Sequence, residues 1–339
     1  MFYSWPDGRY FQCAKICTMC VVGASQFFSS VSAAEVWFSA LDPVWREIRK
    51  APTNDYMKLF DPDAPWQIVA KSVSTVELFK KFVEQGSDSD LRQVISDLQR
   101  RKIALAVQGT PLLASQACGL GVESYGPPHD MAMVAARVKN LGGSIAAVAL
   151  DEPLYYGHQF DHKPLQSFEV IRPTACHASI ADLAQQTARK VAEFHQVFPD
   201  GKIGDVEPIG AYESDEEFAA DFAEWLDAYR TAGGAAFAFV DLDIVWWRPS
   251  WRSQLEIAVR VLKKAGIPFG IIYNGTPADQ TDAAWIEDAK AHIRLVESIL
   301  GMKPNRAKFQ SWTDRPRKIL PETAPDSFTS LVKGYVGRN

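Results

Sequence analysis

Short apolar runs alternate with amphipathic stretches along most of the chain, and this alternation constrains the fold more than any other feature. The runs are rich in apolar and β-branched residues, as in strands that are buried on both faces. The amphipathic stretches have apolar residues at helical spacing, and several end at Gly. The pattern predicts strands over residues 36–41, 66–72, 103–108, 144–150, 202–206, 235–240, 269–273 and 306–311.

About eight such β–α alternations predict an α/β protein of the (β/α)8 TIM-barrel type. A doubly wound open sheet is the competing fold, and it usually carries a G-x-G-x-x-G fingerprint after its first strand. Leu41-Asp42-Pro43 occupies that position here. No Pro/Ser-rich linker divides the sequence, so we expect one barrel domain over residues 35–339.

The first part of the chain departs from this pattern. A weakly positive stretch precedes an apolar run over residues 16–28, and small residues follow at 32–34. This order is typical of a secretory signal peptide, and the run is too short to span a bilayer. We predict that residues 1–34 are a signal peptide or disordered leader and that the protein is secreted or periplasmic. An apolar helix packed on the barrel is the alternative.

Cysteine positions bear on the same question. Cys118 and Cys176 lie beyond the leader, in predicted loops that follow strands on one face of the barrel. A disulfide between them would suit an oxidising compartment, and two unpaired thiols are the alternative.

Composition and charge limit the kinds of partner that the protein is expected to bind. The formal net charge is −5 and no basic block stands out, which argues against a nucleic-acid partner. No segment beyond the leader is apolar and long enough to span a membrane. The three His residues that follow the fourth predicted strand match no zinc-binding spacing. We therefore expect a carbohydrate substrate and neither a metal nor another cofactor.

Acidic residues mark the ends of three neighbouring predicted strands. Asp151 and Glu152 follow the fourth strand, and Asp241 and Asp243 follow the sixth. Asp205 and Glu207 lie at the end of the fifth strand, and because they are two residues apart they share one face of it. Active sites of these barrels lie at the C-terminal ends of the strands. Carboxylates crowded there push their pKa values apart, so that one is held protonated while another stays ionised. Any one acid could instead be a helix cap or an ion-pair partner, but three strands together favour a site.

Glycoside hydrolysis requires such a pair, with one protonated and one ionised carboxyl group. We predict Glu152, Glu207 and Asp241 as catalytic residues. Aromatic rings at the rim would stack on sugars, while polar groups would orient their hydroxyls. The predicted substrate-binding residues are Trp37, Lys71, Gln108, Asp151, Tyr155, Tyr212, Asp243, Trp246, Tyr273, Asn274 and Trp312.

The fourth-strand exit, LDEPLYYGH, resembles the Asn-Glu-Pro exit of a large clan of retaining barrel glycosidases. The resemblance implies that Glu152 is the acid/base. Asp151 stands where the clan has Asn, and Tyr273-Asn274 stands where the clan has its nucleophile Glu. The partner of Glu152 must therefore come from another strand.

Other barrel glycosidases pair a strand-four acid with a strand-five Glu, here Glu207, or a strand-six Asp, here Asp241 or Asp243. The sequence thus predicts a secreted glycoside hydrolase acting on a polysaccharide or oligosaccharide, with Glu152 protonating the leaving oxygen. Two alternatives stay open. Acids on successive strands also hold Mg²⁺ in metal-dependent lyases and isomerases of the barrel type. The missing seventh-strand Glu favours a catalytically inactive carbohydrate-binding barrel.

Overall fold

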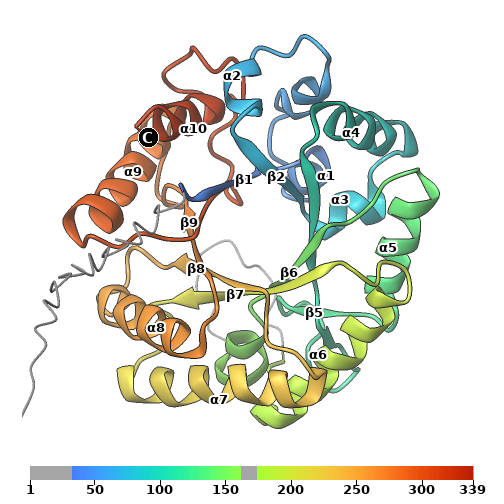
Figure 1. Cartoon of the computed structure of the whole chain (residues 1–339), viewed down its shortest axis with the longest axis vertical. Coiled ribbons are helices and arrows are strands. Elements are labelled where there is room, and N and C mark those ends of the chain that lie inside the picture. The colour runs from blue at the N-terminus through green and yellow to red at the C-terminus, as the bar shows by residue number, and fades with distance from the viewer. Residues whose placement is uncertain (1–32, 162–173, 339) are drawn as a thin grey trace, which may run out of the picture. The chain divides into compact units, whose positions relative to one another are not determined.

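The computed structural model describes residues 33–161 and 174–338. Eight parallel strands close into a barrel, with helices around it (Figure 1). The fold is therefore the predicted single-domain (β/α)8 TIM barrel. In barrel order the strands are β1 (Glu35–Ser39), β2 (Val73–Leu78), β3 (Ala104–Gly109), β6 (Ala147–Asp151), β7 (Lys202–Ile209), β8 (Phe239–Ile244), β9 (Phe269–Tyr273) and β10 (Arg306–Gln310).

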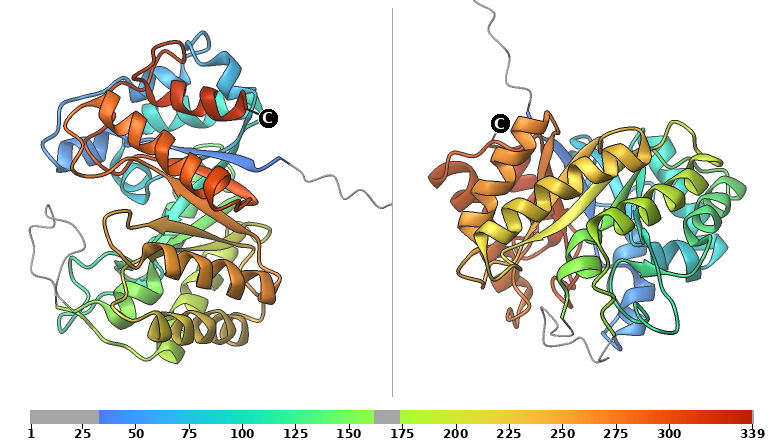
Figure 2. Two further views of the ribbon diagram at one scale, coloured as in Figure 1. Left: turned by 90° about the vertical axis from the view of Figure 1, so that its left-hand side faces the viewer. Right: turned by 90° about the horizontal axis from the view of Figure 1, so that it is seen from below.

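Helices form the outer layer, as the side views in Figure 2 show. The α-helices are α1 (Pro43–Ile48), α2 (Gln67–Ala70), α3 (Lys80–Gln85), α4 (Asp88–Arg101), α5 (Asp130–Asn140), α6 (Ile180–His195), α7 (Asp215–Gly233), α8 (Trp251–Ala265), α9 (Asp282–Ile293) and α10 (Phe328–Val336). A 3-10 helix, η1 (Tyr56–Phe60), and two π-helical segments, η2 (Tyr155–Gln159) and η3 (Arg294–Ile299), complete the helical elements described. Strands β4 (Leu112–Leu113) and β5 (Tyr125–Gly126) pair outside the barrel.

Side-chain caps fix where several helices begin. The hydroxyls of Ser87, Ser179 and Ser214 accept hydrogen bonds from backbone N–H groups in the first turns of α4, α6 and α7. These groups have no partner within the helix, so a serine or threonine at this position stabilises the helix start by about 1 kcal/mol. At the other end, Gly234 and Gly266 adopt left-handed φ values and end α7 and α8, as the Gly signals predict.

The predicted second strand, residues 66–72, is wrong, because this segment contains α2 and the strand begins at Val73. The carboxylate of Glu322 accepts hydrogen bonds from the backbone N–H groups of Ile68 and Val69 at the start of α2. A partner more than 250 residues away cannot be inferred from a local pattern. Lys71 consequently lies at the entrance of β2, at the opposite end of the barrel from the strand exits.

The predicted sixth strand, residues 235–240, also differs from the structure. Strand β8 starts at Phe239 and continues to Ile244, so Asp241 and Asp243 lie within the strand. An ionised carboxylate in a barrel core is stable only where it is paired or hydrogen-bonded. Asp241 has one, because the Arg306 guanidinium donates to it at 2.9 Å.

Small and aromatic side chains fill the middle of the barrel. The inward-facing residues there are Trp37, Ala106, Ala147, Ala149, Val206, Phe239 and Ile272. Because side chains alternate along a strand, residues two or four positions further along β3, β6 and β8 face the same interior, towards the strand exits. These residues are Gln108, Asp151, Asp241 and Asp243.

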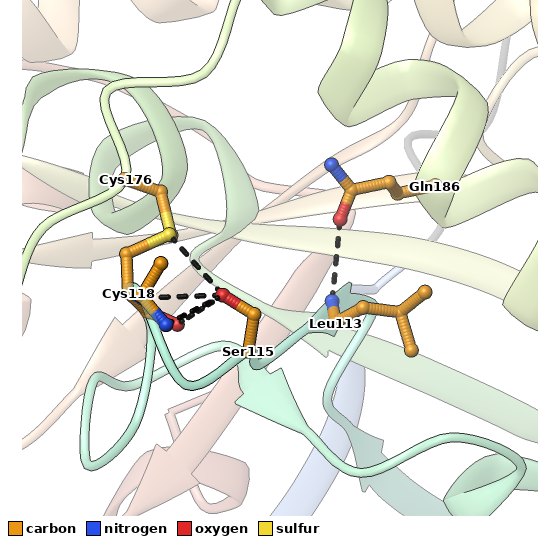
Figure 3. The surroundings of a disulfide bond; sticks show 6 residues. Leu113, Ser115, Cys118, Cys176 and Gln186 are labelled. Atoms are coloured by element: carbon orange, nitrogen blue, oxygen red, sulfur yellow. Dashed lines mark hydrogen bonds between the residues drawn. A yellow bond between two sulfur atoms is a disulfide. The ribbon is translucent and has the colours of Figure 1, made fainter.

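The loop between β3 and α5 is tied to the loop between β6 and α6. Cys118 and Cys176 form a disulfide with their Cα atoms 5.2 Å apart, so the structure supports the bonded alternative (Figure 3). The backbone N–H of Gly119 also donates to the carbonyl of Thr174. The two loops that follow strands three and four of the barrel are therefore fixed to each other.

Residues 1–32 of the predicted leader lie outside the described part of the chain. Within the part that is described, no helix has the length and apolar character needed to cross a membrane.

Candidate active site

The exit of β6 carries the central acid of the site. Asp151 ends the strand, and Glu152 follows with a left-handed φ of 53°. Such a φ is uncommon for a residue with a side chain and persists only where the surroundings fix the backbone. Here the N–H of Glu152 donates to the carbonyl of Val206, and its own carbonyl accepts from Tyr156. Only 8% of Glu152 is exposed.

Burial raises the pKa of Glu152 well above its ordinary value, and neighbouring carboxylates raise it further. The acids that act on it are Glu123, Asp243, Asp151 and Glu207, in decreasing order. Both effects disfavour the ionised form. Burial and the neighbouring acids therefore both favour the protonated form of Glu152.

Asp151 lies between an amide and a second carboxyl group. Gln108 on β3 donates to it at 2.7 Å, which places both predicted residues at the strand exits. Burial raises the pKa of Glu123, in the loop after β3, while Tyr156, Arg49 and Asp151 oppose the shift. Burial and the charge of Glu123 raise the pKa of Asp151 well above its ordinary value, while Lys308 opposes the shift. Glu123 was not predicted, because only Gly and Pro residues marked its loop in the sequence.

Asp243 belongs to a hydrogen-bonded group with two other predicted residues. Asn274 donates to Asp243 at 3.2 Å and accepts from the Trp246 indole at 2.8 Å. The Trp246 ring stacks on His292 with centroids 3.7 Å apart, which fixes its orientation. Burial raises the pKa of Asp243 to about 7, against the opposing effects of Lys308 and Asn274.

A buried lysine lies beneath these acids. Lys308 on β10 is 1% exposed, with its ammonium 2.7 Å from Glu77 and 3.9 Å from Asp241. Burial lowers its pKa, but Glu77, Asp241 and Asp151 outweigh burial and raise it, so Lys308 is positively charged. The sequence did not single out Lys308 or Glu77, because both lie inside strands rather than at their ends.

Glu207, the second predicted catalytic acid, is hydrogen-bonded to the protein backbone. Asp205 and Glu207 share one face of β7, as predicted, but that face points away from the barrel interior. The Glu207 carboxylate accepts from the backbone N–H groups of Leu154 and Tyr155 at 2.7 and 3.1 Å. Burial and the charge of Asp205 raise the pKa of Glu207. Glu207 thus anchors the segment that follows Glu152.

Three predicted substrate contacts do not lie at the open end, and these placements are corrected. Trp37 packs in the barrel core, 5.2 Å from the Phe239 ring, because its position in the middle of β1 faces inward. The hydroxyl of Tyr273 donates to Glu297 on the helical layer, because its position on β9 faces outward. Lys71 precedes β2, as described above.

The remaining aromatic residues lie after the strand exits. Tyr155 and Tyr212 are buried with their rings 6.1 Å apart. Trp246 and Trp312 are half-buried. Trp247, which was not among the predicted contacts, is 42% exposed beside Trp246. These half-buried and exposed tryptophans supply flat apolar surface around the acids.

No protein-family model matches the chain, and no curated protein matches its sequence. Its fold is similar to that of a solved GH10 structure from Paenibacillus barcinonensis, at 11% identity and a TM-score of 0.50, over 90% of this chain and 96% of that one. It is also similar to an endo-β1,6-glucanase, at 8% identity and a TM-score of 0.50, over 82% of this chain and 66% of that one. The structural neighbours are mostly glycoside hydrolases. At such identities the similarity shows the TIM-barrel fold alone.

In residues 33–161 and 174–338, no group of three or more His, Cys, Asp or Glu side chains is arranged to hold a metal ion.

Proposed function

We propose that the protein is a glycoside hydrolase in which Glu152 is the general acid and Asp243 is the base or nucleophile. The observation that carries this proposal is the group of carboxyls at the strand exits. The pKa of Glu152 lies well above its ordinary value, whereas that of Asp243 is raised only to about 7. Two acids whose environments separate their pKa values provide a proton donor and a proton acceptor at the same pH.

The chemistry follows from these protonation states. Glu152 would donate its proton to the glycosidic oxygen as the bond to the leaving sugar breaks. Ionised Asp243 would either take a proton from the attacking water or attack the anomeric carbon itself. The hydrogen bond from Asn274 holds the Asp243 carboxylate in place. Trp246 and Trp312 would offer stacking surfaces to the sugar rings.

This assignment takes Asp243 in place of the sequence-based choices of Glu207 and Asp241. Glu207 uses its carboxylate to hold the backbone N–H groups of Leu154 and Tyr155. Asp241 is engaged by the Arg306 guanidinium. Asp243 bonds only to a neutral amide in the contacts described, and its carboxylate is therefore the better candidate.

The test is a screen of purified protein against polysaccharides and oligosaccharides, read by released reducing sugar. Once a substrate is found, Glu152→Gln and Asp243→Asn should each reduce kcat by at least about 100-fold. Glu287→Gln changes an exposed acid on α9 and is the matched control. Asp243→Asn with the activity of the Glu287→Gln control would refute the assignment of the base. Binding of oligosaccharides with no product from any of them would favour the non-catalytic alternative.

We also propose an oxidising, extracytoplasmic location. The Cys118–Cys176 disulfide supports it, since such bonds persist mainly in oxidising compartments. Cell fractionation of the native host, followed by thiol labelling, tests this: recovery from the cytoplasm with both thiols free would refute it.

A further inference from the structure

A polar cavity of about 220 Å³ lies between the loops that follow β9 and β10. It is much larger than the about 10–15 Å³ that a single water molecule requires. Loops that follow barrel strands lie at the end where the strands exit, so the cavity is on the same face as the candidate active site. The charged and amide side chains that line it are Asp279 and Gln280 from the first loop and Asp314, Arg315 and Arg317 from the second.

Both loops also begin beside residues of the candidate active site. Asn274, which donates to Asp243, lies at the start of the first loop. Trp312 directly precedes Thr313, which lines the cavity in the second loop. A saccharide that stacks on Trp312 would therefore extend towards this cavity.

Arg317 is the cationic side chain of the cavity that lacks a counter-charge. It is half-buried, and its buried Nε has no hydrogen-bond partner among the described residues. No ion pair within residues 33–161 and 174–338 involves Arg317, whereas Arg315 pairs with Asp282 at 3.1 Å. A buried polar group without a partner is uncommon and points to a ligand or to water. A guanidinium matches a carboxylate best, because its N–H groups form two parallel hydrogen bonds to the two oxygens.

Neighbouring contacts fix the backbone on both sides of Arg317. The hydroxyl of Thr313 donates to the carbonyl of Arg315 at 2.9 Å. The carboxylate of Asp282 accepts from the Arg315 guanidinium and, at 2.9 Å, from the backbone N–H of Lys318. The backbone that carries Arg317 is therefore held in place without a ligand, which lowers the entropic cost of binding one.

The acids that line the cavity do not cancel its positive charge. Asp314 is exposed, so water screens its carboxylate. Burial raises the pKa of Asp279 and the charge of Asp288 raises it further, against the hydrogen bond from the Thr276 N–H. Arg46 adds another positive charge from beneath the loop, where its guanidinium donates to the backbone carbonyl of Asp314 at 3.4 Å. This distribution of charge favours an anionic group beside Arg317.

We propose that this cavity binds a sugar residue that carries a carboxylate, such as a uronic acid, with Arg317 pairing with the carboxylate. Asp314 and the side-chain oxygen of Gln280 accept hydrogen bonds from the hydroxyls of the sugar. A simple anion would be repelled by the acids of the cavity, and a neutral sugar would leave Arg317 without a counter-charge. The inference rests on the proposed function for its saccharide, and it narrows that substrate class to acidic saccharides.

The test is a titration of the purified protein with glucuronate and galacturonate, followed by protein-detected NMR. We expect both to bind at least about tenfold more tightly than glucose and galactose, which lack the carboxylate. Added salt should weaken the binding of the two uronates, because the contact is an ion pair. Equal affinities for the acidic and the neutral sugars would overturn the proposal.

Arg317→Gln removes the charge and should weaken uronate binding at least about tenfold. Its stability in urea should equal that of the wild type, because the guanidinium has no partner to lose among the described residues. Arg189→Gln removes an exposed arginine on α6 and is the matched control, with unchanged binding. Uronate binding in Arg317→Gln as tight as in this control would refute the role of Arg317.

Inorganic phosphate distinguishes an acidic sugar from an anion of any kind. Phosphate that binds as tightly as the uronates, with the same dependence on Arg317, would overturn the assignment to a sugar. Binding does not require hydrolysis, so uronate binding without product from any saccharide would refute the proposed function alone. Hydrolysis of saccharides by a protein that binds no uronate would refute only this inference.

Discussion

Replacing Lys308 with Met tests the electrostatics beneath the candidate site. Lys308 and Glu77 are each 1% exposed and their charged groups are 2.7 Å apart. Methionine has a similar length and keeps the packing but removes the charge. Breaking a buried ion pair by removing one partner typically costs about 3–5 kcal/mol of unfolding free energy, because the remaining charge has no partner.

The loss should depend on pH, and its sign follows from Glu77. Burial already raises the pKa of Glu77 above its ordinary 4.5, with Lys308 opposing the shift. Without Lys308 the pKa rises further, so folded Glu77 binds a proton at pH values where the unfolded chain has released it. Stability then falls as pH rises above about 4.5, by about 1.4 kcal/mol per pH unit for one proton. Between pH 5 and pH 7 the unfolding free energy of Lys308→Met should fall by about 2–3 kcal/mol, and by more than that of the wild type, in which Lys308 keeps the pKa of Glu77 lower.

Urea unfolding of wild type and Lys308→Met at both pH values measures this difference. The double variant Lys308→Met/Glu77→Met replaces the pair with apolar side chains and should recover much of the stability. A loss that is the same at pH 5 and pH 7, or a double variant no more stable than Lys308→Met, would refute the reasoning.

Three further predictions concern other parts of the molecule. Cys118→Ser/Cys176→Ser removes a disulfide that closes a separation of 58 residues and should lower the unfolding free energy by about 4 kcal/mol in urea unfolding; equal stability of oxidised wild type and variant would contradict this. Trp225→Phe removes the 2.8 Å hydrogen bond to buried Asp205 and should cost about 1–3 kcal/mol more than Trp285→Phe, whose indole N–H has no hydrogen-bond partner in the described part of the chain. The pKa of Asp243, about 7, predicts that kcat falls as pH drops through neutrality, and a pH–rate profile that is flat there would contradict a basic role.

Most of the fold could be predicted from local sequence patterns. Strand β9 begins and ends where the sequence predicts, because Gly266 ends the preceding helix and a polar loop follows Tyr273. The placement of Glu152 was also predictable, since the exit of a barrel strand can be located from one apolar run and the Asp-Glu-Pro that follows it. Both inferences need only neighbouring residues in the chain.

Contacts between distant residues could not be predicted in the same way. Glu123 lies in the long loop after β3, and only the course of that loop brings it near Asp151. Lys308 on β10 contacts Glu77 on β2 across the strand between them, because β1 pairs with β10 on one side and with β2 on the other. The charge of Lys308 was visible in the sequence, but its inward orientation depends on the register of barrel closure.

Strand β7 shows most clearly what the alternation of side chains cannot predict, which is the face of the strand that points into the barrel. Side chains two apart share a face, so Asp205 and Glu207 were correctly paired. A strand buried on both faces gives no polar side by which to choose the inward one. The physical clue was Gly204. A Cβ at this position would lie within about 2 Å of the Phe239 ring in the barrel core, so the even-numbered residues of β7 face inward. Glu207 therefore faces outward, and the acid that shares the interior with Asp151 comes from β8, at Asp243.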